Sequence, residues 1–311
     1  MIQDGLRHRE PWAEHSRSQM ALEASSPGSL GRGAHTIRLL ALDLDGTLID
    51  DGLVISPGVR RAIAAAQEHG VAVTLATGRM FDATLPFAHD LGITAPLVCY
   101  QGGLIQAPDS DVPLYRATME PALVREVLEW QARRGWHVVL YADDDVFIAG
   151  QQYPEIFYRS LLGERLVWVD DLSPVLEQHE PVKFLVVVAE PPEADRIEAE
   201  LRRGFEGRME VVRSHAMFVE GNPLGVSKGD ALRRLAAYLG VPQAQVMAVG
   251  DQGNDVPMIA WAGVGVAMGN ASHAAKAVAD WIAPPLAEDG AAVAIERFVL
   301  NRSFPLHHQQ V

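Results

Sequence analysis

A pair of aspartates follows an apolar run near the start of the chain. The run covers residues 39–42, and Asp43 and Asp45 come next, followed by Gly46 and Thr47. Side chains two apart on an extended chain point the same way, and ligands of open α/β sheets bind at the carboxyl ends of the strands. Because two such carboxylates repel each other, the pattern predicts a bound cation such as Mg²⁺, which prefers oxygen ligands. An ordinary surface turn is the alternative, since Asp-Gly is frequent in turns.

A second apolar run, residues 246–249, also ends in acidic residues. Asp251 follows it closely, and Asn254 and Asp255 come within the next four positions. Together with the first pair, one site would gather four carboxylates, which requires a divalent cation and a nearby ammonium. The amide of Asn254 suits a phosphate or hydroxyl group. The alternative is a helix N-terminus rich in Asp and Asn.

The chain has only three lysines, Lys183, Lys228 and Lys276, and otherwise uses arginine for positive charge. Lys228 directly follows Ser227, the expected N-cap of a helix, where the positive end of the helix dipole opposes a cation. A lysine at this unfavourable position suggests a compact charge for a carboxylate and phosphate site, with an exposed surface lysine as the alternative. Lys183, at the start of another apolar run, is a second candidate for substrate contact.

The run at residues 71–76 ends in Thr77, Gly78 and Arg79. A hydroxyl and the amide of a flexible glycine at a strand end both donate to phosphate oxygens, although a structural turn explains the same residues. Arg79 pairs either with a phosphate or with an acidic neighbour.

The whole chain has the composition of an ordinary globular protein. It has 311 residues, 48% of them hydrophobic, and a formal net charge of −14. This size favours two domains, and the charge argues against nucleic acid or an anionic membrane as a partner. The single cysteine, Cys99, cannot form an internal disulfide, and no apolar run approaches the length of a membrane span. We therefore predict a soluble, cytoplasmic protein.

The order of the expected elements predicts an α/β core interrupted by an insertion. Apolar strands at 39–42 and 71–76 flank a helix that is capped by Ser56 and begins at Pro57, as in a right-handed βαβ unit with a parallel sheet. The middle of the chain mixes strands and helices like a separate α+β lobe, after which the first pattern resumes. The predicted parts are a disordered leader (1–35), the first part of the core (36–116), an inserted cap (117–217), the second part of the core (218–301) and a tail (302–311).

Taken together, these residues resemble the haloacid dehalogenase superfamily. Its four motifs appear in order at Asp43–Thr47, Thr77–Arg79, Lys228 and Gly250–Asp255. The large insertion, with the segments 225–229 and 254–258, is similar to the Cof-type subfamily (subclass IIB) of phosphatases. The resemblance implies a Rossmann-like core with a parallel sheet and an inserted α+β cap of the C2 type. Gln101 departs from the asparagine usual in such proteins, which leaves its role open.

The resemblance also implies a mechanism and a substrate class. Asp43 would be the nucleophile that forms an aspartyl-phosphate, and Asp45 the general acid and base. Mg²⁺ would be held by Asp43, the backbone carbonyl of Asp45 and Asp251. Groups that would bind the phosphate or support the site are Thr77, Gly78, Lys228, Asn254, Asp255, Thr47 and Arg79. The partner would be a small phosphate ester, such as a sugar phosphate, flavin mononucleotide or pyridoxal phosphate. A phosphotransferase or phosphomutase, and a non-catalytic binding module, are the alternatives, and the oligomeric state is open.

Overall fold

The computed structural model describes residues 36–301 apart from Asp51, Glu164 and Ala216. Nothing is described for the side chains of Ser160, Leu161 and His215. The predicted leader and tail both lie outside the described residues. The described residues fall within a single compact unit, residues 35–311.

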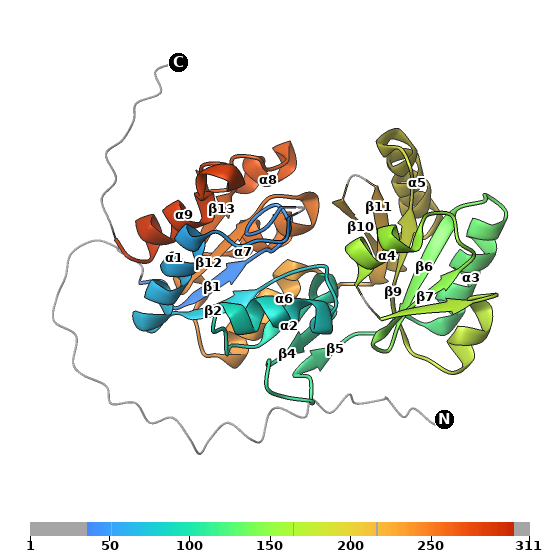
Figure 1. The fold of residues 1–311 in the computed structure, drawn as a ribbon, viewed down its shortest axis with the longest axis horizontal. Coiled ribbons are helices and arrows are strands. Elements are labelled where there is room, and N and C mark those ends of the chain that lie inside the picture. The colour runs from blue at the N-terminus through green and yellow to red at the C-terminus, as the bar shows by residue number, and fades with distance from the viewer. Residues whose placement is uncertain (1–35, 51, 164, 216, 302–311) are drawn as a thin grey trace, which may run out of the picture. The chain divides into compact units, whose positions relative to one another are not determined.

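A five-stranded parallel sheet forms the first layer (Figure 1). Its strand order is β14-β13-β12-β1-β2, and all neighbours pair in parallel. The strands are β1 (Leu39–Leu42), β2 (Ala72–Leu75), β12 (Val246–Gly250), β13 (Val264–Ala267) and β14 (Trp281–Ile282). Every residue of β1 and β12 is buried, as expected for central strands covered on both faces. The strands predicted from the apolar runs at residues 39–42, 71–76 and 246–249 are thus confirmed.

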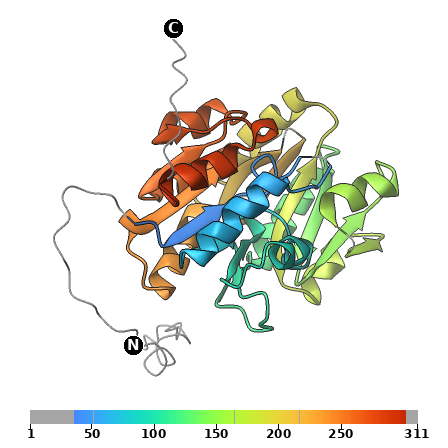
Figure 2. The same cartoon turned by 60° about the vertical axis from the view of Figure 1, so that its left-hand side comes forward.

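Helices connect and cover these strands. They are α1 (Pro57–Glu68), α2 (Phe81–Asp90), α6 (Lys228–Tyr238), α7 (Val256–Trp261), α8 (His273–Val278) and α9 (Gly290–Phe298). As the sequence predicts, Ser56 caps α1, and its hydroxyl accepts a hydrogen bond from the Val59 amide at 3.1 Å. The same helix, blue in Figure 2, packs against β2 and α9. In the described part of the chain, no helix is both long and apolar enough to span a bilayer.

A short antiparallel sheet follows the second helix. Its strands are β3 (Leu97–Cys99), β4 (Leu104–Gln106) and β5 (Tyr115–Arg116). An isolated parallel bridge between Ala76 and Val98 joins β3 to the end of β2. The turn after β3 contains Gln101 at a φ of 59° and its amide donates to the Thr77 carbonyl at 3.1 Å, so this turn lies beside the end of β2.

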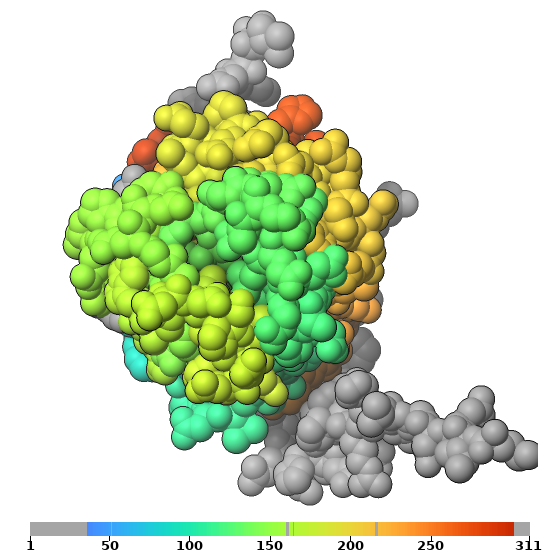
Figure 3. Space-filling model, turned by 90° about the vertical axis from the view of Figure 1, so that its right-hand side faces the viewer, coloured from blue at the N-terminus to red at the C-terminus, as the bar shows by residue number. Residues whose placement is uncertain are grey.

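The inserted region builds a second, six-stranded sheet in the order β10-β11-β9-β6-β7-β8. Its strands are β6 (His137–Ala142), β7 (Asp145–Ala149), β8 (Leu166–Val169), β9 (Pro181–Val187), β10 (Met209–His215) and β11 (Phe218–Pro223). Its helices are α3 (Pro121–Ala132), α4 (Glu155–Leu162) and α5 (Pro191–Gly204). Residues of this region, coloured green to yellow, make up most of the face seen in Figure 3.

The two faces of this sheet bury different cores. Along β6, Val139 and Tyr141 belong to the same apolar cluster as the parallel sheet, whereas Val138 and Leu140 belong to a second cluster with residues of α3 and α5. The alternation follows from the opposite directions of successive side chains on a strand. One face of the inserted sheet therefore packs toward the parallel core.

The insertion extends beyond its predicted end at residue 217. That boundary falls in the turn between β10 and β11, and β11 pairs with both β10 and β9 in the six-stranded sheet. Residues 218–223 were therefore wrongly placed in the core. The strand is hard to recognise because Gly221, Asn222 and Pro223 resemble a loop, and it is backbone pairing to its neighbours that defines it.

Candidate active site

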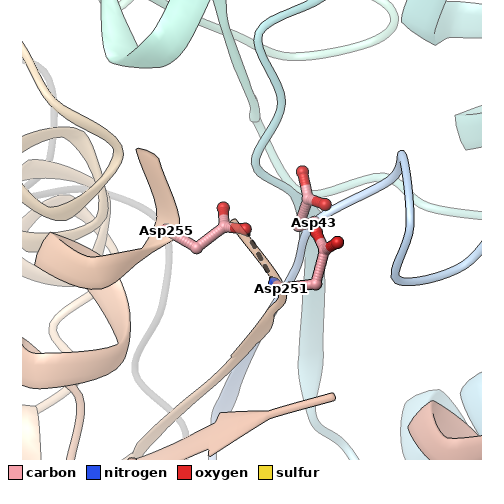
Figure 4. Close-up of side chains that lie close together, drawn as sticks. All are labelled: Asp43, Asp251 and Asp255. Carbon is pink, nitrogen blue, oxygen red and sulfur yellow. Dashed lines mark hydrogen bonds between the residues drawn. The ribbon is translucent and has the colours of Figure 1, made fainter. Parts of the chain in front are cut away.

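The ends of β1 and β12 bring three carboxylates together. These strands are neighbours in register, with Leu42 opposite Val249, and the Asp43 amide donates to the Val249 carbonyl at 2.9 Å. Asp43, Asp251 and Asp255 are each at least 96% buried, and one oxygen from each lies within 4.8 Å of the others. Figure 4 shows the three side chains gathered at the ends of the two strands. The sequence expectation that both acidic runs meet at one edge of the sheet is confirmed for these residues.

Lys228 supplies the ammonium of this cluster. It is the first residue of α6, after the N-cap Ser227, whose hydroxyl accepts from the Asp230 amide at 3.0 Å. Its Nζ lies 2.6 Å from Asp43 Oδ1 and 2.6 Å from Asp255 Oδ1, and the side chain is only 1% exposed. The alternative of an exposed surface lysine is therefore wrong.

Asp255 holds the loop that carries Asp251. Its Oδ2 accepts a hydrogen bond from the Asp251 amide at 2.8 Å (Figure 4). The same oxygen accepts from the Gln252 amide at 2.9 Å, while Oδ1 faces Lys228. Both oxygens of Asp255 are thus engaged by the protein. Gly46 approaches the same loop with a φ of 82°, and a side chain at this position would collide with the Asp251 carboxylate.

The cluster contains three carboxyl groups and one ammonium. Burial, followed by the nearby Asp255 carboxylate, raises the pKa of Asp43 well above its usual range. The same two causes raise the pKa of Asp251 to about 7. Burial alone would lower the pKa of Lys228, but the adjacent carboxylates of Asp255 and Asp43 raise it. One ammonium therefore does not balance three carboxylates.

The unbalanced cluster fits a hard divalent cation. Asp251 Oδ1 and Thr47 Oγ1 are buried and have no hydrogen-bond partner among the described residues. The groups available as metal ligands at this edge of the sheet are carboxylate and hydroxyl oxygens, which suit Mg²⁺. A cation here would offset the cost of burial and the repulsion between carboxylates, which together raise the pKa of Asp43 and Asp251.

Asp45 points to a different partner. Its carboxylate is paired with the Arg79 guanidinium, through Nε at 2.8 Å and Nη2 at 2.5 Å. The Asp45 side chain is 53% exposed and does not belong to the buried cluster. Asp45 therefore stays outside the buried set that the sequence expected it to join, although its charge adds, after burial and Asp255, to the raised pKa of Asp43 and Asp251. Of the two partners considered for Arg79, a phosphate and an acidic neighbour, the structure shows the acidic neighbour, Asp45.

The other predicted phosphate-binding residues lie around Gln101. Thr77 is fully buried, and its hydroxyl accepts from the Arg79 amide at 3.1 Å. A side chain at Gly78 would meet the end of the Gln101 side chain, which would have to move to make room. The Asn254 amide donates to Gln101 Oε1 at 3.0 Å, and Asn254 Oδ1 is buried without a partner among the described residues. Gln101 thus joins the second and fourth motif segments.

A buried ion pair links this loop to the inserted sheet. Lys183 Nζ lies 2.7 Å from Glu220 Oε2 and donates to the Gly78 carbonyl at 3.0 Å, while Gln101 Nε2 donates to Glu220 Oε1 at 3.0 Å. The two charged side chains are 3% and 4% exposed. Lys183, considered as a substrate contact, is instead paired with protein groups. Sequence reasoning missed Glu220. Its position could have been noticed because Glu220 is the single charged residue in the stretch 217–227.

Comparisons with known proteins agree with this arrangement. Residues 40–295 match the family model for haloacid dehalogenase-like hydrolases. The chain is 33% identical over 264 residues to the 5-amino-6-(5-phospho-D-ribitylamino)uracil phosphatase YcsE of Bacillus subtilis, covering 85% of this chain and 96% of that protein. It is 29% identical over 259 residues to YitU, a phosphatase of the same name from that species, covering 82% of this chain and 94% of the relative.

A solved structure shows the same fold. A haloacid dehalogenase-like hydrolase from Bacteroides thetaiotaomicron is 30% identical and superposes with a TM-score of 0.73, covering 84% of this chain and 99% of that one. The predicted fold class, an α/β core with a parallel sheet and an inserted cap, is confirmed. The chain is a hydrolase and belongs to the haloacid dehalogenase-like hydrolase family.

Proposed function

We propose that this protein is a Mg²⁺-dependent phosphatase that hydrolyses a small phosphomonoester through an aspartyl-phosphate on Asp43. The observation that carries this proposal is the buried set of three carboxylates around one lysine at the ends of β1 and β12. An excess of buried negative charge is costly without a cation, and a cation there attracts an anionic substrate. The relatives named above are phosphatases, which supports the same chemistry.

In the first step, an Asp43 oxygen attacks the phosphorus and the bond to the leaving alkoxide breaks. Asp45 donates a proton to that oxygen, so a neutral alcohol departs. In the second step, Asp45 takes a proton from water, and the resulting hydroxide attacks the same phosphorus. The bond from phosphorus to Asp43 then breaks, which releases inorganic phosphate and restores the carboxylate. Arg79 orients Asp45 through its two hydrogen bonds.

The remaining residues bind and neutralise the phosphoryl group. Asp43, the backbone carbonyl of Asp45 and Asp251 would hold Mg²⁺, with Asp255 and Thr47 in support. When bound, the ion offsets charge on the phosphoryl oxygens. Lys228, Thr77, Gly78 and Asn254 donate hydrogen bonds to those oxygens.

The substrate class includes sugar phosphates, flavin mononucleotide, pyridoxal phosphate and the phosphoribitylaminouracil after which two relatives are named. A phosphotransferase or phosphomutase would use the same nucleophile but pass the phosphoryl group to another acceptor. The cytoplasmic location stays a prediction.

Phosphate release tests the proposal. We would measure it with p-nitrophenyl phosphate and a panel of these esters, with Mg²⁺ and with EDTA. The Asp43→Asn variant should lose at least about 10⁴-fold in turnover, because it lacks the nucleophile. Asp109→Asn, the same change at an exposed aspartate between β4 and β5, is the matched control and should retain activity. Full activity of Asp43→Asn, or turnover unaffected by EDTA, would contradict the proposal.

A further inference from the structure

Asn222 on β11 is a buried amide with unused hydrogen-bonding capacity. The residue is 1% exposed, and neither Oδ1 nor Nδ2 has a hydrogen-bond partner within the part of the chain that the structure describes. Burying a primary amide without partners is unfavourable, so such groups normally meet a ligand, a water or another side chain. Asn222 therefore offers one acceptor and one donor side by side to a bound molecule.

The position of Asn222 points it toward the catalytic core. Successive side chains of a strand alternate between its faces, so Asn222 lies on the same face as Glu220. Glu220 accepts a hydrogen bond from Gln101 of the core loop. Only five residues separate Asn222 from Lys228 in the sequence.

The neighbouring strand, β9, places Lys183 on the same face of the sheet as Asn222. β11 pairs with β9 as far as Gly221 opposite Phe184, and Lys183 is the next residue of β9 beside Asn222. Lys183 donates to the carbonyl of Gly78, in the predicted phosphate-binding loop. The face that bears Asn222 thus contacts the loops around the candidate active site.

The polar groups next to Asn222 already have partners. Glu220 accepts from Lys183, Gln101 and Ser214. Lys183 contacts Glu220 and Gly78, and its Nζ lies 4.6 Å from the centre of the Tyr141 ring. Among the described residues beside Glu220 and Lys183, Asn222 is left with open donor and acceptor positions.

We propose that Asn222 binds the leaving group of the substrate. The leaving group presents an adjacent N–H and C=O to Asn222, as found in amides, lactams and cyclic imides. Asn222 Oδ1 accepts from the N–H, and Nδ2 donates to the C=O, so that two parallel hydrogen bonds form. This inference rests on the proposed phosphatase function and narrows its substrate class. It favours esters whose leaving group carries such an edge over plain sugar phosphates and pyridoxal phosphate.

A pair of esters that differ by one methyl group tests the inference. Flavin mononucleotide has a cyclic imide, and its N3-methyl analogue lacks only the imide N–H. We expect kcat/KM to be at least about tenfold higher for flavin mononucleotide, because the analogue leaves the Asn222 oxygen unpaired and crowds it. In Asn222→Leu, which has a similar shape without polar atoms, the ratio of the two values should fall to about one.

Three controls separate recognition from folding. Hydrolysis of p-nitrophenyl phosphate, which has no such edge, should change less than about twofold in Asn222→Leu. The Tm of Asn222→Leu should stay the same or rise, since an unpaired buried amide is removed. Val219→Ala, on the opposite face of β11, should lower the Tm by creating a cavity and leave the ratio of the two esters unchanged.

The outcomes distinguish the two proposals. Hydrolysis of p-nitrophenyl phosphate without faster turnover of flavin mononucleotide than of its analogue overturns the role of Asn222, while the phosphatase stands. A preserved ratio in Asn222→Leu, or a Tm several degrees lower, also overturns that role, because Asn222 would then serve the fold. If no ester is hydrolysed with Mg²⁺, the proposed function itself fails.

Discussion

The protein buries two lysines, and each lies in a different charge environment. Lys228 of the parallel core is 1% exposed and contacts Asp43 and Asp255, with Asp251 in the same cluster. Lys183 of the inserted sheet is 3% exposed and pairs with one carboxylate, Glu220. The first group has an excess of negative charge, whereas the second is balanced.

This difference separates a binding site from a structural contact. Buried charges are costly unless they are paired, so a balanced pair requires no further ligand. In the core, burial and the neighbouring carboxylates raise the pKa of Asp43 and Asp251, and an Asp251 oxygen has no partner among the described residues. An incompletely neutralised cluster is thus suited to a cation and a phosphate, and the balanced pair joins β9 and β11 to the loop at Gly78.

The largest expected effect is on catalysis and distinguishes substitutions of the two lysines. Lys228→Met should lower kcat/KM for p-nitrophenyl phosphate by about 10³-fold, because it removes a cation that faces the transferred phosphoryl group. Lys183→Met, the matched change at the other buried lysine, should lower it by less than about tenfold. Steady-state kinetics at saturating Mg²⁺ measure both. Equal losses would show that the two lysines do not differ in role.

The second effect concerns stability. Lys183→Met should lower the free energy of unfolding by about 3 kcal/mol, because Glu220 is left buried without its cation. Adding Glu220→Gln should recover most of that loss, so that the double-mutant cycle is strongly non-additive. Urea unfolding in EDTA measures the values. Arg202→Met removes an exposed pair with Glu198 and should cost less than about 0.5 kcal/mol. Additive losses for Lys183 and Glu220 would argue against the pair.

The smallest effect concerns a third basic group, His137, which is buried without a carboxylate among its recorded partners. Tyr158 accepts from the amides of Gln152 and Tyr153, so its hydroxyl proton is directed to His137 Nε2 at 2.7 Å, and the ring must be neutral to accept it. Burial lowers the pKa of His137 accordingly. Its folded pKa thus lies below the unfolded value of about 6.5.

Because the unfolded chain binds this proton first, the stability contributed by neutral His137 should be complete above about pH 6.5 and decrease as the pH falls below it. The loss due to His137 should be about 1 kcal/mol or less, and it is obtained as the difference between the wild type and His137→Gln in urea unfolding between about pH 7.5 and pH 5.5. The glutamine keeps an acceptor but does not titrate, and the comparison cancels the opposite contribution of Asp251, whose pKa is raised to about 7. An unchanged slope in this variant would assign the acid sensitivity to other groups.

Local sequence patterns were sufficient for much of the fold. Apolar runs followed by Asp43 and Asp251 predicted adjacent strand ends, and Ser56 and Ser227 predicted helix starts that the structure confirms. The unfavourable position of Lys228 in the first turn of α6 correctly singled it out as a buried partner of carboxylates. These features succeed because strand periodicity, capping and charge repulsion act over a few residues.

Contacts between distant segments required the tertiary structure. Gln101 and Glu220 are 119 positions apart, and the sequence gives no sign that one accepts a hydrogen bond from the other. The Asp45 side chain pairs with Arg79, 34 positions away, which the alternation of an extended strand does not predict. The sequence by itself thus determined the parallel core, its motif order and the residue types at the strand ends, since these depend on local periodicity. Only the tertiary structure decided which polar groups are paired and which, like Asn222, remain open, because pairing depends on how separate strands and loops pack together.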